Sequence, residues 1–240
     1  MKATSFEFRY RALLIGLIYS VGFWVYSFDH INVVWAIVSR AVGPDSPHAG
    51  LFVRLSFVLA TVLVVFGALI RTWGAAYLRS DVVHDAKLHS GVLVADGPYR
   101  YARNPLYFGG ILSNVGAALM ASRLGFVILV VGLTVLYLRL TGYEEVQMEI
   151  QQGDSYREYS RRVPRLWPAI TPRVPPGQSK PRWGQAFLGE AFMWGFALAV
   201  AAFAATLKLL VSAIIFGVAM VAFVQQQYVH NRRRRTAPQA

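Results

Sequence analysis

Long apolar segments alternate along this chain with short polar ones. A helix that crosses a bilayer needs roughly 20 mostly apolar residues, or somewhat fewer when Arg, Lys, Trp or Tyr anchors its ends. The pattern predicts six such helices, over residues 12–28, 55–70, 106–121, 124–138, 186–205 and 209–224. The second helix is expected to continue past Arg71 towards Leu78, because an arginine near a helix end can reach the lipid headgroups.

The composition supports a membrane protein. The 240 residues are 55% hydrophobic and 15% charged, with a mean hydropathy of +0.42, which is too apolar for an ordinary water-soluble domain. The absence of cysteine excludes disulfides, thiolate metal sites and a cysteine nucleophile. Asp29, His30 and Asn32 follow the first apolar segment in place of a small-residue cleavage site, so we expect a retained helix. The predicted fold class is an all-α, polytopic transmembrane helical bundle.

The net charge of +12 reflects where the basic residues lie. If the amino terminus is cytoplasmic, the outer segments hold only four of the 24 lysines and arginines, namely Arg40, Arg54, Arg123 and Lys208. This bias obeys the positive-inside rule and predicts that both termini are cytoplasmic. Because membrane topology accounts for the basic charge, we do not expect nucleic acid as a partner. The basic tail 232–235 can contact anionic lipids.

Polar and proline-rich stretches divide the chain into four parts. Residues 1–79 carry the N-terminal helices, and residues 80–168 form a core of a polar loop, a helical hairpin and an amphipathic surface helix broken at Gly153. Residues 169–185 are a proline-rich linker, and residues 186–240 form a terminal hairpin with a basic tail. Pro105 suits the first turn of the third spanning helix, where Asn104 can act as the capping side chain. Only Ser122 and Arg123 separate the third and fourth helices, so these two must be antiparallel.

Two polar segments should meet at the cytoplasmic ends of that hairpin. The first runs over residues 91–110, and the second is Tyr143-Glu144-Glu145. Glycines permit a close backbone approach, Tyr99 and Tyr107 can flank a planar or cationic group, and a carboxylate binds amines, hydroxyls or cations. A nucleoside that carries a sulfonium is one of many ligands that satisfy this chemistry. Solvated charges that balance nearby arginines are the plainer interpretation.

Other polar residues carry weaker signals. His84 and His89 lack the further ligands that a metal site needs, so we predict no metal. Glu190, early in the fifth apolar segment, can pair with an arginine or line a substrate path.

The motif Leu93-Val94, Gly97, Tyr99, Arg103-Asn104-Pro105, Tyr107 and Gly109 is followed one hairpin later by Glu144-Glu145 and by Arg162-Val163-Pro164. Over about 91–168 the chain resembles the integral membrane methyltransferases typified by isoprenylcysteine carboxyl methyltransferase. The resemblance implies that S-adenosylmethionine binds at the cytoplasmic face. The implied cofactor contacts are Gly91, Val92, Leu93, Val94, Tyr99, Arg103, Asn104, Pro105, Leu106, Tyr107 and Glu144.

The resemblance also implies catalytic roles for Arg139 and Glu145, and a lipid or other hydrophobic acceptor drawn from the membrane. Two positions depart from the pattern. Asn104 stands where the isoprenylcysteine enzymes have histidine, whereas the related phosphatidylethanolamine methyltransferases also have Asn-Pro. The substrate-side arginine falls on Leu140, next to Arg139. The acceptor is therefore open among carboxylates, amines and thiols, as is the oligomeric state. The alternative is a non-enzymatic transport or assembly subunit with the same fold.

Overall fold

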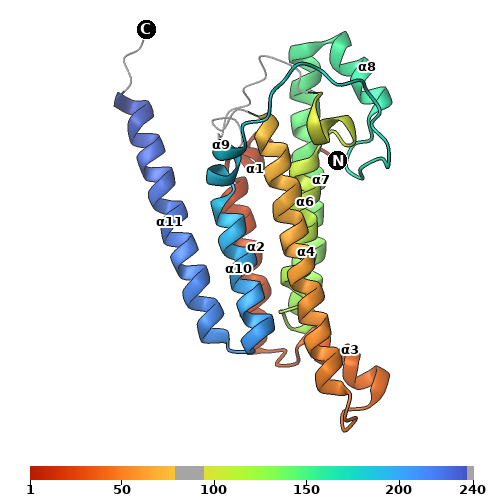
Figure 1. Cartoon of the computed structure of the whole chain (residues 1–240), viewed down its shortest axis with the longest axis vertical. Coiled ribbons are helices and arrows are strands. Elements are labelled where there is room, and N and C mark those ends of the chain that lie inside the picture. Colours follow the sequence, from red (N-terminus) through yellow and green to blue (C-terminus); the bar gives the residue numbers. More distant parts are fainter. Residues whose placement is uncertain (79–94, 237–240) are drawn as a thin grey trace.

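The computed structural model describes residues 1–78 and 95–236, which form helices and connecting segments with no β-strand (Figure 1). The predicted all-helical class is confirmed. The helices are α1 (Ser5–Arg9), α2 (Arg11–Trp24), η1 (Val25–Ser27), α3 (Val33–Val42), α4 (Ala49–Tyr77), η2 (Gly97–Arg100), α6 (Pro105–Ala118), α7 (Arg123–Gln152), α8 (Asp154–Arg162), α9 (Trp183–Gly189), α10 (Ala191–Thr206) and α11 (Leu209–Thr236).

Three of the described helices are long and apolar enough to cross a membrane: α4, α7 and the Leu209–Gln226 part of α11. The pair α9 and α10 would make a fourth span if it is counted as one, although it bends by 61° at Glu190. The predicted spans 12–28 and 106–121 correspond to shorter helices, α2 with η1 and the 14-residue α6. Length and composition therefore support three or four spans.

Helices α4 and α6 form the closest packed pair of the bundle because small residues face each other across it. A β-carbon on Gly67 would collide with Ser113 Oγ and with the carbonyl oxygen of Gly109. A β-carbon on Gly116 would lie 2.6 Å from the carbonyl oxygen of Ala60. The two backbones thus touch, as small residues allow in membrane helix pairs.

The tight turn between α6 and α7 confirms the predicted antiparallel hairpin. Ser122 caps α7 by accepting a hydrogen bond from the backbone N–H of Gly125 (3.1 Å). Asp29 accepts hydrogen bonds from the Arg123 guanidinium and from the backbone N–H of Leu124. The connection between α2 and α3 therefore locks the turn in place.

The opposite end of the bundle carries η2, α8 and the linker, and we call it the polar end (Figure 1). Helix α7 extends about four turns beyond its predicted span and ends at Gly153, whose φ of 56° favours glycine. The break predicted at Gly153 is thus confirmed. Helix α8 then folds back onto the polar end.

The C-terminal helices dock on α4 through α9 and α10. The indole N–H of Trp194 donates to Thr72 Oγ1 (3.0 Å), and the backbone N–H of Arg182 donates to the Ala76 carbonyl (2.7 Å). Glu190 pairs with Arg71, which is one of the two roles that its sequence position suggests. Helix α11 packs on α10 and forms the outer edge of the bundle (Figure 1).

The contact between α4 and α6 predicts a position-specific response to added methyl groups. Gly67→Ala is expected to destabilise the protein by about 1–3 kcal/mol, because the new β-carbon enters an occupied space. The matched control is Gly50→Ala on the same helix, where no atom lies within 4 Å. That change should leave stability equal or slightly higher, by up to about 1 kcal/mol. Thermal unfolding in detergent measures both, and equal midpoints would contradict the packing described.

Candidate functional site

Tyr107 and Glu144 meet where α6 begins and α7 leaves its apolar part. The Tyr107 hydroxyl donates a hydrogen bond of 2.7 Å to Glu144 Oε1. The Tyr107 ring packs edge to face on Tyr137, with centroids 5.6 Å apart. Arg11, at the start of α2, lies within electrostatic range of both Glu144 and Tyr107. The two predicted segments therefore meet, and α2 adds a cation that the sequence did not suggest.

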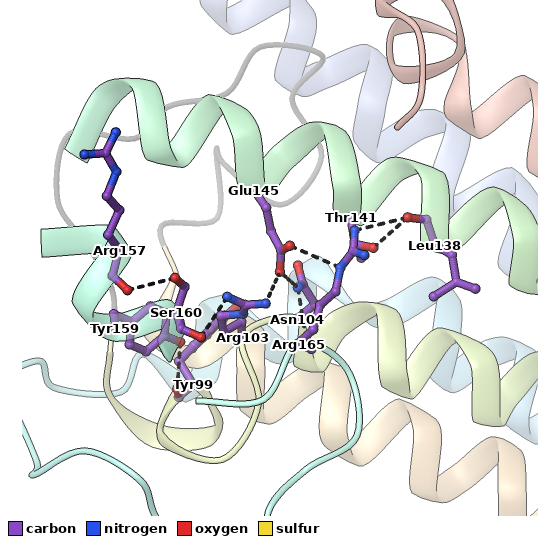
Figure 2. A network of polar contacts seen from close by, with 10 residues as sticks. All are labelled: Tyr99, Arg103, Asn104, Leu138, Thr141, Glu145, Arg157, Tyr159, Ser160 and Arg165. Atoms are coloured by element: carbon purple, nitrogen blue, oxygen red, sulfur yellow. Dashed lines mark hydrogen bonds and ion pairs between the residues drawn. The ribbon is translucent and has the colours of Figure 1, made fainter. Parts of the chain in front are cut away.

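Glu145 faces a different side of α7 and organises a separate polar network (Figure 2). Its Oε1 accepts a hydrogen bond from the Asn104 amide and pairs with Arg103 Nη2, both at 3.1 Å. Its Oε2 pairs with Arg165 Nε at 3.1 Å. A single carboxylate thus ties α7 to the start of α6 and to the chain that follows α8. Beside this network lies a cavity of about 300 Å³.

Asn104 stands at the N-cap position of α6, but its side chain makes no capping hydrogen bond, so the predicted capping role is wrong. The amide instead donates to Glu145 and to the Arg165 carbonyl (3.0 Å). Pro105 occupies the first turn as predicted, since a proline needs no hydrogen-bond acceptor there. The Leu106 carbonyl accepts a hydrogen bond from Arg71 Nη1 (3.3 Å).

The buried hydroxyl of Tyr99 has no hydrogen-bond partner among the residues that the structure describes, and the residue is only 8% exposed. The backbone carbonyl of Tyr99 accepts a 2.7 Å hydrogen bond from the Tyr159 hydroxyl. Two residues before Tyr99, Gly97 has a φ of 55° and packs on the Tyr77 ring. Burial raises the pKa of the Tyr99 hydroxyl, so this group keeps its proton and can donate. A buried donor without an acceptor is costly, so this hydroxyl is a candidate for contact with a ligand.

The other predicted residues are placed as follows. The Arg139 guanidinium donates to both carboxylate oxygens of Glu7 in α1, at 2.9 and 2.8 Å. The pair lowers the pKa of Glu7 to about 2, chiefly through these hydrogen bonds. Arg139 is thus engaged with α1 and makes no hydrogen bond to Glu144 or Glu145. Gly91, Val92, Leu93 and Val94 lie outside the described residues, as do His84 and His89.

Sequence reasoning missed Arg165 and Arg71 as parts of this region. Arg165 lies among prolines in a segment without periodicity, so no pattern marked its contact with Glu145. The sequence predicts that Arg71 reaches the lipid headgroups, but its guanidinium turns inward to Glu190 and to the Leu106 carbonyl. A charged residue inside an apolar segment was the available signal, because such residues usually face the bundle interior.

The linker is held along the polar end by backbone and carboxylate contacts. The backbone N–H of Arg103 donates to the Pro164 carbonyl (2.9 Å), and that of Ala169 donates to the Tyr101 carbonyl (2.9 Å). Asp96 accepts hydrogen bonds from the backbone N–H groups of Gly177 and Ser179. Burial raises the pKa of Asp96, but these two N–H groups outweigh it, so the pKa lies below its ordinary value.

Comparison with known proteins finds a family match in the middle of the chain. Residues 55–154 match the family model described as phospholipid methyltransferase. The matched segment holds Tyr107, Glu144 and Glu145 and confirms the resemblance to the integral membrane methyltransferases. Arg165 and Glu190 lie outside the matched segment. Neither the curated proteins nor the solved structures gave a match.

The Asp96 contacts predict how the linker responds to charge and pH. Asp96→Asn should weaken docking, so the backbone amides of Gly177 and Ser179 should lose hydrogen-exchange protection severalfold. In the wild type, the folded pKa lies below the unfolded value of about 4. The contribution is therefore complete above that value and is lost as the pH falls through the lowered pKa. Asp154→Asn, whose side chain is 96% exposed, is the control. Unchanged protection in Asp96→Asn would refute this role.

Proposed function

Because residues 55–154 match the phospholipid methyltransferase family, we propose that the protein methylates a lipophilic acceptor with S-adenosylmethionine. The observation that carries the proposal is the hydrogen-bonded pair of Tyr107 and Glu144, which joins the two halves of the motif at the polar end.

The residues around this pair fit such a cofactor. Glu144 offers a carboxylate to the amino group or the ribose hydroxyls of the cofactor, and its negative charge favours the positive charge on the cofactor's sulfur. Tyr99 offers a buried hydroxyl donor that lacks a partner among the described residues. Tyr107 and Tyr137 offer aromatic faces, which attract cations. We propose that Arg103, Asn104, Pro105 and Leu106 shape the adjoining backbone, and that Gly91, Val92, Leu93 and Val94 complete the site.

When bound, S-adenosylmethionine would supply a methyl group carried on a positively charged sulfur. The acceptor's nucleophilic atom would bond to the methyl carbon as the carbon–sulfur bond breaks, and a neutral thioether would be left. The protein's part is to align the acceptor and to exclude water. An amine acceptor loses a proton, and we propose Glu145 as the carboxylate that takes it. A carboxylate or thiolate acceptor needs no such base. Arg139 is engaged with Glu7, so we propose that it orders α1 beside the site.

We further propose six spans with both termini cytoplasmic, in which α2 with η1 and α6 complete the set. Basic residues gathered at the polar end support this orientation. Since the chain contains no cysteine, single cysteines report it directly. In intact cells, an impermeant maleimide should label Asp45→Cys but label Gln178→Cys only after permeabilisation. The reverse labelling pattern would refute the orientation, and labelling of both in intact cells would refute the six-span topology.

Cofactor binding tests the site itself. Glu144→Gln and Tyr107→Phe are each expected to weaken S-adenosylmethionine binding roughly ten- to hundredfold, because each removes one side of a charge-assisted hydrogen bond. The double variant should lose less than the product of the two effects, since both changes break one interaction. Calorimetry on detergent-purified protein measures the affinities. The matched control is Glu158→Gln on α8, a carboxylate that is 66% exposed.

Two outcomes would contradict the proposal. Equal affinities in all variants would place the cofactor elsewhere. A folded wild-type protein that binds no S-adenosylmethionine would refute the enzyme and favour a non-enzymatic membrane subunit.

A further inference from the structure

A buried ion pair joins α4 to the bend between α9 and α10. Arg71 Nε and Nη2 donate hydrogen bonds of 2.7 and 2.9 Å to the two carboxylate oxygens of Glu190. The Glu190 side chain is 1% exposed and that of Arg71 is 20% exposed. Arginine remains protonated in proteins, and a charge out of water must be paired. Glu190 therefore cancels a permanent positive charge inside the bundle.

Direct contacts connect this ion pair to the candidate cofactor site. Arg71 Nη1 donates to the Leu106 carbonyl, one residue before Tyr107. The stem of Arg71 fits against Gly109, where a β-carbon would lie 2.8 Å from Arg71 Cγ. Electrostatic interactions link Arg71 to Tyr107, and they link the Tyr99 hydroxyl to Arg71, Glu144 and Glu190. The ion pair thus borders the same interior region as the predicted cofactor contacts.

Glu190 comes from outside the segment that matches the family. It lies at the 61° bend between α9 and α10, where its backbone N–H donates to the Ala186 carbonyl (2.9 Å). The contacts of Trp194 with Thr72 and of Arg182 with Ala76 hold this bend against the end of α4. The C-terminal helices therefore place one carboxylate on a cation of the family domain.

We infer that Glu190 is a positioning residue that neutralises Arg71, so that the adjoining site can accept a cationic sulfonium cofactor. The inference rests on the proposed function. Without Glu190, the Arg71 guanidinium would repel the sulfonium through a low-dielectric interior, where like charges interact strongly. The demethylated product, S-adenosylhomocysteine, carries no charge on sulfur and would not feel this repulsion. Glu190 thereby sets the preference of the site for the methyl donor over the product.

The test is the ratio of the affinities for S-adenosylmethionine and S-adenosylhomocysteine, measured by calorimetry on the full chain in detergent. Glu190→Gln leaves Arg71 unpaired and should lower this ratio about tenfold. The double variant Arg71→Gln/Glu190→Gln also lacks the ion pair but carries no charge there. Its ratio should stay within about threefold of the wild type. A purely structural ion pair would shift both variants alike.

Each remaining result decides between the claims. If Glu190→Gln and the double variant have the same ratio of the two affinities, the role of Glu190 is overturned. Binding of S-adenosylmethionine by the wild type would still uphold the cofactor site. Wild-type protein that binds neither ligand refutes the proposed function instead. If Glu190→Gln does not fold, the single variant Arg71→Gln is measured in its place. It removes the cation, so its ratio should equal or exceed that of the wild type, and a tenfold fall would overturn the inference.

Discussion

The direct contact of the α4 and α6 backbones is the constraint on which the rest of the structure depends. Gly67 and Gly109 allow this approach, and Gly109 also leaves room for the stem of Arg71. Any larger residue there would push the first turn of α6 away from Arg71 and Glu190. Because Tyr107 lies on that turn, the spacing of two helices determines where its hydroxyl meets Glu144.

Two adjacent carboxylates on α7 have different surroundings because neighbouring residues on a helix point about 100° apart. Glu144 turns towards Tyr107 and Arg11 and is the carboxylate that we propose for the cofactor. Glu145 turns towards Arg103, Asn104 and Arg165 and holds the polar end together (Figure 2). One glutamate pair thus serves both a candidate binding role and the assembly of the chain around it.

The amino-acid pattern predicted the local features well. The helix start at Pro105, the hairpin at Ser122 and the break at Gly153 follow from residue chemistry acting over a few positions. The convergence of Tyr107 and Glu144 followed from the hairpin. The partners of Arg139, Arg165 and Glu190 could not be predicted, because no shared periodicity relates the segments that meet in each contact. Such contacts depend on how whole helices dock.

The central proposal is that S-adenosylmethionine binds between α6 and α7 at the polar end. Cross-linking the labelled cofactor to the purified protein with ultraviolet light, followed by tryptic peptide mapping, tests it most directly. The account predicts label in the peptides 104–123 or 140–157, which carry Tyr107 and Glu144. Saturable labelling confined to other parts of the chain, such as α10 or α11, would contradict it.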